Sequence, residues 1–255
     1  MEEYGEILLI VMLLFLVLII LGKTYGAYKR EDSVPIMDSV SSVSSSIANA
    51  GTDVLRLSII FISFGLMVSK MAVFYLETNI FTYLVAFIII DFYGYWTYFI
   101  AHQVNFSLNK HAIHHSSEEF NLVCNLKQTV SSFINLFPFL LIPAAIIEVP
   151  IAIIVMTLLI QLFLQFWYHT KHIKKVGFLE HILVTPSHYT AHHAIKPKYI
   201  DENYSQIFII WDKLFHAFQE ELEDPPPVYG ITRPVKTYNP IRINFQHLGL
   251  LISDT

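Results

Sequence analysis

Long apolar runs dominate the first part of the chain, and each is bounded by charged or polar residues. Residues 7–22 carry no charge and end at Lys23, and two further runs at 54–76 and 80–101 are joined by the short polar stretch 77–79. About 20 consecutive apolar residues form a helix that crosses the hydrocarbon core of a bilayer. The pattern predicts one membrane-crossing helix followed by an antiparallel pair.

A second pair of apolar runs follows at residues 130–147 and 150–170, broken at Glu148-Val149-Pro150. Proline is tolerated there as the first residue of the next helix. Residues 171–255 are more polar and hold no apolar run long enough to cross a bilayer. We therefore expect an all-α, multi-pass membrane protein with about five crossings.

Residues 31–53, between the first two runs, are rich in serine with apolar residues threaded through them. A disordered linker would carry fewer apolar residues, so this stretch predicts an amphipathic segment at the membrane interface. The expected organisation is an N-terminal helix and interfacial segment at 1–53, a membrane domain at 54–220 and an extrinsic tail at 221–255.

Basic residues indicate the orientation of these helices. Every Lys and Arg except Lys70 falls on one side of the arrangement, and such residues accumulate on the cytoplasmic side of membranes. The N-terminus is then outside, and residues 23–53, 102–129 and 171–255 lie together inside. Two histidine-rich stretches consequently meet in one helical cap on the cytoplasmic side.

Composition agrees with a membrane protein and narrows its partners. The 255 residues are 54% hydrophobic and 15% charged, with a formal net charge of -5. No basic stretch is interleaved with aromatic residues, which argues against nucleic acid as a partner. The single cysteine, Cys124, can close no disulfide within the chain and makes a cysteine-based zinc site improbable.

Two groups of histidines are the strongest chemical signal in the sequence. If their segment is helical, His111, His114 and His115 share one face and can converge on a common point. A lone histidine near an apolar segment is most often a packing residue. Here a second group, His188, His192 and His193, repeats the pattern. More than four imidazoles exceed the needs of one tetrahedral zinc, so two metal ions are implied.

Histidine ligands need nearby acceptors that fix their tautomers. The candidates near the histidines in sequence are Asp91, Glu118, Glu119, Asn121, Glu180 and Asp201. Asp91 differs from the others because it lies inside a predicted span. A carboxylate there is costly in hydrocarbon and should face a partner or a cavity.

Several motifs, in order, resemble the fatty acid hydroxylase and sterol desaturase superfamily, and within it the alkylglycerol monooxygenase branch. They are DFYGYW at 91–96, HAIHHSSEEFNL at 111–122, QFWYHT at 165–170, TPSHYTAHH at 185–193 and NYSQIFIIWDKLF at 203–215. The resemblance implies a membrane-embedded diiron centre that activates O2 to oxidise a lipid C–H bond. In the alkylglycerol branch it implies tetrahydrobiopterin as reductant. It also implies the endoplasmic reticulum, with the mitochondrial inner membrane as an alternative.

The chain departs from the family pattern at two ligand positions. Tyr98 and Tyr189 stand where the family has histidines, and Lys171 stands where it has an acid. His188 is adjacent to Tyr189, but a shift of one residue turns a helical side chain by about 100°. The retained metal-ligand candidates are His102, His111, His114, His115, His169, His192 and His193. This pattern is compatible with two bound metal ions, one or none.

Two functions from different classes follow. The first, which these losses favour, is a catalytically inactive member of the family. Such a pseudoenzyme would serve as a scaffold, lipid binder or accessory subunit of a membrane complex, with membrane lipids and other subunits as partners. The second is an active, O2-dependent lipid monooxygenase. A metal transporter is a third, weaker alternative.

Overall fold

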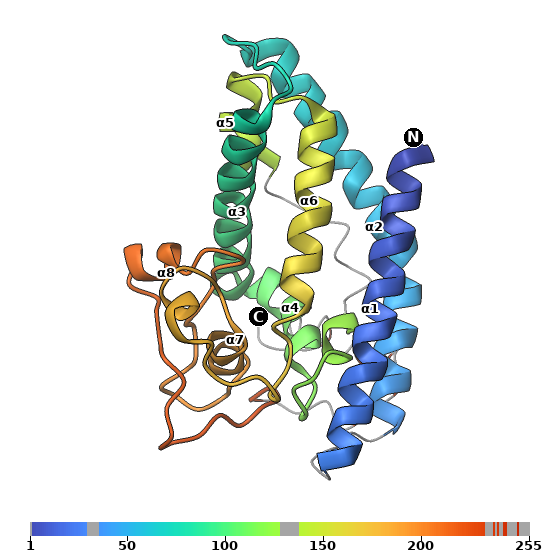
Figure 1. The fold of residues 1–255 in the computed structure, drawn as a ribbon, viewed down its shortest axis with the longest axis vertical. Coiled ribbons are helices and arrows are strands. Elements are labelled where there is room, and N and C mark those ends of the chain that lie inside the picture. Colours follow the sequence, from blue (N-terminus) through green and yellow to red (C-terminus); the bar gives the residue numbers. More distant parts are fainter. Residues whose placement is uncertain are drawn as a thin grey trace.

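Helices account for all regular structure in the part of the chain that the computed structural model describes. It describes residues 2–29, 36–127 and 138–232, together with residues 237, 239, 242, 243 and 249. Within these ranges the extended contacts are two isolated bridges, Leu183 with Phe208 and Ala194 with Tyr229. Long helices form an upright bundle, and several of the short helices gather beside one end of it (Figure 1). The predicted all-α membrane fold is confirmed.

Three helices match predicted membrane crossings in length and apolar character. They are α1 (Glu2–Lys29), the second half of α2 (Ile36–Met71) and α3 (Ile80–Gln103). A fourth apolar helix, α6 (Ile151–Phe166), is shorter, with 16 residues. The structure thus supports a multi-pass protein, with α6 shorter than the predicted run 150–170.

The predicted crossing at 130–147 is not one long helix in its described part. Residues 128–137 lie outside the described residues, and the remainder forms the 3-10 turn η3 (Pro138–Leu141) and α5 (Ile142–Ile146). Pro143 falls in the first turn of α5. Proline lacks an amide N–H and cannot continue a helix from the preceding turn, which explains the interruption.

The serine-rich segment is helical and continuous with the second crossing. α2 runs from Ile36 to Met71 without a break, although residues 31–53 were expected to form a separate interfacial segment. Its serines return hydrogen bonds to the preceding turn, as in Ser42 Oγ to Asp38 O at 2.9 Å and Ser44 Oγ to Val40 O at 2.7 Å. The domain boundary at residue 53 stays a prediction.

The bundle packs around small and branched side chains. Ile60 and Phe64 of α2 meet Ile90 of α3 and Ile153 of α6 in one buried cluster. α1 docks separately on α6, where Phe15 stacks on Phe166 with ring centroids 4.0 Å apart. The three helices α2, α3 and α6 therefore share one core, and α1 is added to its side.

Asp91 explains how the C-terminal part of the chain is held against α3. Its fully buried carboxylate accepts hydrogen bonds from the backbone N–H of Ile207 at 2.9 Å and Phe208 at 3.1 Å, and from Trp211 Nε1 at 2.8 Å. Trp211 belongs to α8 (Ile210–Leu214). Asp91 thus has the partner that a carboxylate inside a span requires. It anchors the cap and does not act as an acceptor for the imidazoles.

The two loops at the far end of the bundle lie together, as the topology predicts. Val73 N donates to Ile146 O at 2.9 Å, which joins the loop before α3 to the last residue of α5, where the loop before α6 begins. Figure 1 shows these loops at the end of the bundle opposite to α4 and α7. We expect single cysteines at residues 78 and 148 to react with an impermeant label from one membrane side, and a cysteine at 116 from the other. Labelling of residues 78 and 116 from the same side would refute this topology.

Candidate metal centre

The short helix α4 (Asn105–His115) directs its histidines in two directions. His111 and His115 are one turn apart, and their Nε2 atoms face each other at 3.0 Å. His114 precedes His115 by one residue and is therefore rotated by about 100° around the helix. The expectation that all three imidazoles converge on one point is wrong, because α4 divides them between two neighbouring sites.

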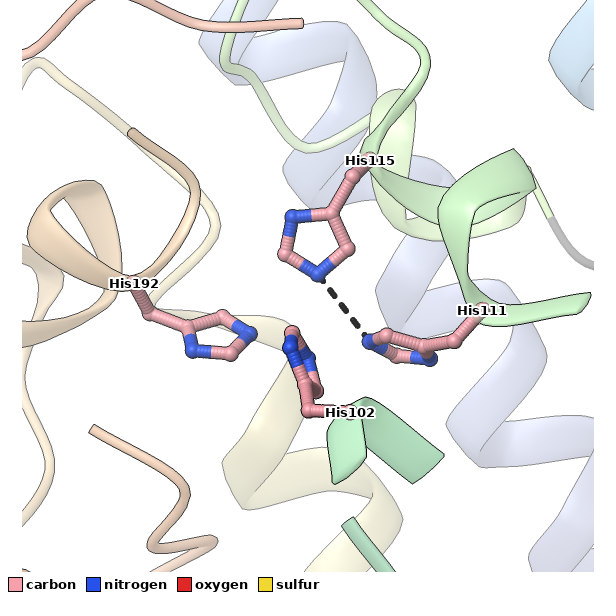
Figure 2. Close-up of side chains that lie close together, drawn as sticks. All are labelled: His102, His111, His115 and His192. Carbon is pink, nitrogen blue, oxygen red and sulfur yellow. Dashed lines mark hydrogen bonds between the residues drawn. The ribbon is translucent and has the colours of Figure 1, made fainter. Parts of the chain in front are cut away.

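Seven imidazoles form two sets, and each set comes from several elements. We call His102, His111, His115 and His192 the four-histidine set, and His114, His169 and His193 the three-histidine set. The potential ligand atoms of each set lie within 4.8 Å of one another. Figure 2 shows the four-histidine set, with His102 from the end of α3, His111 and His115 from α4, and His192 from α7 (Pro186–His192). All seven predicted ligand candidates belong to one of the two sets.

The ring nitrogens on the outer side of several imidazoles are fixed by backbone carbonyls. His192 Nδ1 lies 2.9 Å from Glu202 O, His169 Nδ1 3.0 Å from Gln165 O, and His114 Nδ1 3.3 Å from Lys127 O. A carbonyl only accepts, so each Nδ1 carries the proton and each Nε2 keeps its lone pair. The sequence could not identify these acceptors, because every residue has a backbone carbonyl.

Several ring nitrogens in this centre have no hydrogen-bond partner and are free to bind a metal ion. Nε2 of His102, His169, His192 and His193 is buried and has no hydrogen-bond partner. A buried polar atom without a partner is costly, and most such atoms in proteins are satisfied. Metal coordination would satisfy these lone pairs. The donor sets therefore fit two ions that accept imidazole ligands, such as iron, zinc or copper.

Burial keeps six of the seven imidazoles, those of His111, His114, His115, His169, His192 and His193, in the neutral form that binds metal. Desolvation, reinforced by neighbouring histidines, holds the pKa values of His111, His115, His169, His192 and His193 well below the usual value. Burial likewise lowers the pKa of His114 to about 4. A neutral imidazole offers its lone pair at pH 7 without first releasing a proton.

The metal-free protein is expected to lose stability on acidification. A histidine that titrates near 6.5 when unfolded and lower when folded binds more protons unfolded, so stability falls as pH drops below 6.5. For His114, a folded pKa of about 4 corresponds to a loss of roughly 3 kcal/mol by pH 4. Thermal unfolding in detergent between pH 7 and pH 4 measures this. Loading with metal should move the decline to lower pH, and an unfolding temperature that rises on acidification would contradict the assignment.

Tyr98 and Tyr189 lie against both histidine sets. Their hydroxyl oxygens are 2.7 Å apart in a mutual hydrogen bond. The Tyr98 ring is 4.7 Å from that of His111, and the Tyr189 ring is 4.4 Å from that of His169, measured between centroids. Burial raises the pKa of Tyr189, which keeps it a neutral phenol at pH 7. Tyr98 and Tyr189 therefore form a hydrogen-bonded pair beside the sets.

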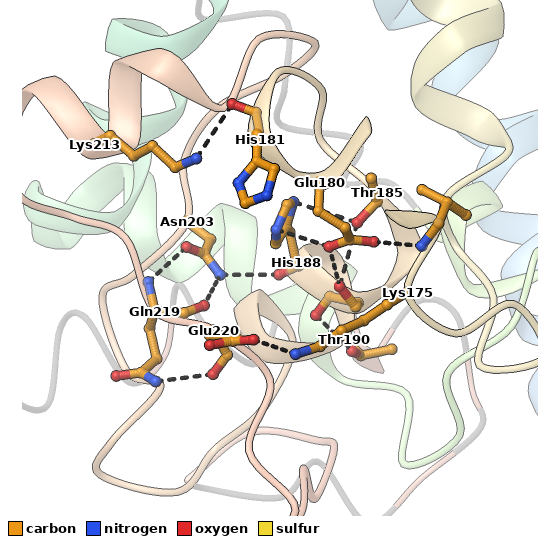
Figure 3. A network of polar contacts seen from close by, with 12 residues as sticks. Lys175, Glu180, His181, Thr185, His188, Thr190, Asn203, Lys213, Gln219 and Glu220 are labelled. Atoms are coloured by element: carbon orange, nitrogen blue, oxygen red, sulfur yellow. Dashed lines mark hydrogen bonds and ion pairs between the residues drawn. The ribbon is translucent and has the colours of Figure 1, made fainter. Parts of the chain in front are cut away.

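His188 belongs to neither set. Its Nε2 lies 3.0 Å from Glu180 Oε2 and its Nδ1 3.3 Å from Thr185 Oγ1, so it points away from both sets into a separate network (Figure 3). Asn203 Nδ2 donates to His188 O at 3.0 Å in the same network. His188, the possible substitute for a ligand at Tyr189, therefore does not take that place, in line with the rotation of about 100° between neighbouring helical residues. The network instead supports α7, which carries His192.

The remaining acceptor candidates have different partners. Asn121 Oδ1 accepts from Val123 N at 2.8 Å and shapes the turn after α4. Lys171 Nζ is paired with Glu119 Oε2 at 2.9 Å, so its charge is compensated and Glu119 is not an acceptor for the imidazoles through that oxygen. Asp201 lies near a ligand candidate, with Oδ1 3.7 Å from His102 Nδ1. Among the acids proposed, Asp201 is the one near an imidazole of the two sets, whereas Glu180 contacts His188 outside them.

Comparison with known proteins agrees with this geometry. A family model described as fatty acid hydroxylase matches residues 83–217, which include all seven histidines. The alkylglycerol monooxygenase of Homo sapiens is 41% identical over 167 residues, 66% of this chain and 37% of that protein. Those of Xenopus tropicalis and Danio rerio are 38% and 39% identical, each over 67% of this chain and 37% of the relative. The chain thus covers little more than a third of these relatives. No solved structure matches it.

Proposed function

Because the chain belongs to the fatty acid hydroxylase family, we propose that its histidine centre binds two metal ions and oxidises a C–H bond of a membrane lipid with O2. One observation carries this proposal. Each set brings at least three ligand atoms within 4.8 Å without any contribution from Tyr98 or Tyr189. The loss of two family ligands therefore leaves enough imidazoles for both ions.

The two sets offer a bound ion different numbers of protein ligands. The three-histidine set would leave more coordination positions of a bound ion open to a further group than the four-histidine set would. Iron, when bound here, would supply the activation of O2. The protein contributes imidazoles whose orientation is fixed in His114, His169 and His192 by carbonyls of the surrounding backbone.

The position of the centre supports a lipid as substrate. The histidines lie at one end of an apolar helical bundle. One of them, His102, stands at the end of the membrane-spanning helix α3. The relatives named above are alkylglycerol monooxygenases, which makes an alkylglycerol the first lipid to test. Tetrahydrobiopterin is the reductant proposed for such an activity. The endoplasmic reticulum remains the proposed location.

A second candidate function is a catalytically inactive scaffold, lipid binder or accessory subunit that retains the fold. The hydrogen-bonded pair of Tyr98 and Tyr189 favours it, because neutral phenols replace two imidazoles beside the sets. A neutral tyrosine is a poor ligand, since its hydroxyl normally titrates near pH 10. This function would require partner subunits but no lipid product.

Product formation separates the two candidates. The purified chain in lipid nanodiscs, loaded with iron and supplied with O2, tetrahydrobiopterin and an alkylglycerol, should form an oxidised product. His115→Ala removes a ligand and should abolish turnover, whereas His181→Ala removes an exposed histidine outside both sets and should not. No product from the native chain, with two irons bound, would favour the scaffold.

A further inference from the structure

We propose that a buried ion pair between Asp38 and Lys127 positions His114 and thereby sets the metal affinity of the three-histidine set. Asp38 lies in α2, outside the residues 83–217 that match the family model. This inference rests on the proposed metal-binding function. It assigns a positioning role to a segment of the chain that carries no ligand itself.

The pair is part of a closed polar triangle. Lys127 Nζ donates to Asp38 Oδ1 at 2.7 Å and to Ser117 Oγ at 3.1 Å, and Ser117 Oγ donates to Asp38 Oδ2 at 3.1 Å. Asp38, Ser117 and Lys127 are 7%, 5% and 2% exposed, so solvent screens the charges little. Ser117 follows the histidine helix α4 by two residues. The triangle joins α2 to both ends of the stretch after α4.

The same lysine residue contacts a ligand candidate through its backbone. His114 Nδ1 lies 3.3 Å from Lys127 O, and Lys127 N donates to Cys124 O at 2.9 Å. Fixing the Lys127 side chain therefore also fixes the carbonyl that holds the tautomer of His114. Hydrogen-bond partners of metal-bound histidines orient the ring, and their loss typically lowers metal affinity about 10- to 100-fold.

A role in positioning explains why the ion pair is buried. Desolvating two charges commonly costs as much as their attraction returns, so a buried pair is weak evidence of added stability. Apolar side chains of similar volume could fill this space at little cost. They could not hold the chain at Lys127 by directional contacts to both α2 and Ser117.

The effect should be confined to one metal position. His114 belongs to the three-histidine set alone. In the four-histidine set, His192 is held by Glu202 O at 2.9 Å and His102 lies near Asp201, neither of which touches the triangle. Loss of the ion pair should therefore weaken one of two bound ions and leave the other unchanged.

Metal titration of the full chain in nanodiscs tests the inference with Co²⁺ and Zn²⁺ as probes. Asp38→Asn is expected to weaken one of two binding steps about 10- to 100-fold. Glu220→Gln, which breaks the exposed ion pair with Lys175, should bind both ions like the native chain. Two unchanged binding steps in Asp38→Asn would overturn the proposal.

A double variant separates positioning from stability. Asp38→Asn leaves Lys127 buried without its counter-ion and lowers the unfolding temperature, whereas Asp38→Asn with Lys127→Met removes both charges and should recover it. Affinity of the weakened step should stay low in the double variant, because the contacts that fix the carbonyl of residue 127 are still missing. Recovery of affinity together with stability would show a purely structural role.

Histidine ¹⁵N spectra provide a readout that does not require metal. In the native chain the His114 signal, assigned by its loss in His114→Gln, should report a proton on Nδ1. Asp38→Asn should shift it toward a mixture of tautomers, and an unchanged signal would overturn the positioning role. If the native chain bound no metal but Asp38→Asn changed this tautomer, the proposed function would fail and the positioning role would stand.

Discussion

Replacing Asp91 by alanine is expected to detach the cap from the bundle and to cause the largest loss of stability of any single change away from the histidines. Three donors, the buried N–H group of Ile207 and the partly buried N–H group of Phe208 and indole of Trp211, would lose their shared acceptor. An unsatisfied buried donor costs about 1–3 kcal/mol, so the total should reach several kcal/mol. Because residues 207–211 lead back through the cap to α7, His192 and His193 would lose their fixed positions.

Thermal unfolding and limited proteolysis in nanodiscs measure this effect. The Asp91→Asn variant retains one oxygen, that of the side-chain amide, as acceptor. It should lose clearly less stability than Asp91→Ala. Proteolysis of Asp91→Ala should release fragments cut between residues 170 and 232 while α1, α2 and α3 stay protected. An Asp91→Ala protein as stable and as protease-resistant as the native chain would show that the carboxylate does not anchor the cap.

Converting both tyrosines to histidine is expected to strengthen metal binding. Tyr98 is beside His111 of the four-histidine set, and Tyr189 beside His169 of the three-histidine set. Imidazole is a better neutral ligand than phenol, so Tyr98→His with Tyr189→His should raise the affinity for iron at both positions. Turnover, if the native chain shows it, should rise as well.

Tyrosine-to-phenylalanine changes provide the matched control for this experiment. Tyr98→Phe with Tyr189→Phe removes the mutual hydrogen bond at 2.7 Å but introduces no ligand. Iron bound per chain, measured after equilibration at limiting iron, should increase in the histidine variant and stay unchanged in the phenylalanine variant. Equal iron content in the native and histidine proteins would show that the two positions do not face the metals.

The membrane helices could be predicted from run length alone, because a bilayer demands about 20 apolar residues in sequence. The run at 130–147 failed this reasoning, since a new short helix begins within it at Ile142, with Pro143 in its first turn. The serine-rich segment before residue 54 also misled, because serines that bond to the preceding turn do not interrupt a helix. Apolar content identified the segments but not where their helices begin and end.

The seven histidines could be identified from the sequence. Only part of their division into two sets could be predicted from it. Helical rotation separates His114 from His111 and His115. The assignment of His192 and His193 to different sets depends on how α7 docks, which local sequence does not specify. The acceptors of His114, His169 and His192 are backbone carbonyls, and Asp38 reaches the centre from 89 residues before Lys127. Such contacts arise from tertiary packing.

Metal content tests most directly whether the two separate sets of imidazoles each hold one metal ion. The native chain, purified in nanodiscs and equilibrated with iron without chelator, should contain about two irons per chain. His115→Ala and His193→Ala each remove a ligand from a different set and should each retain about one, whereas both changes together should leave close to none. A native chain with no bound metal, or single variants that each lose both ions, would contradict two independent metal positions.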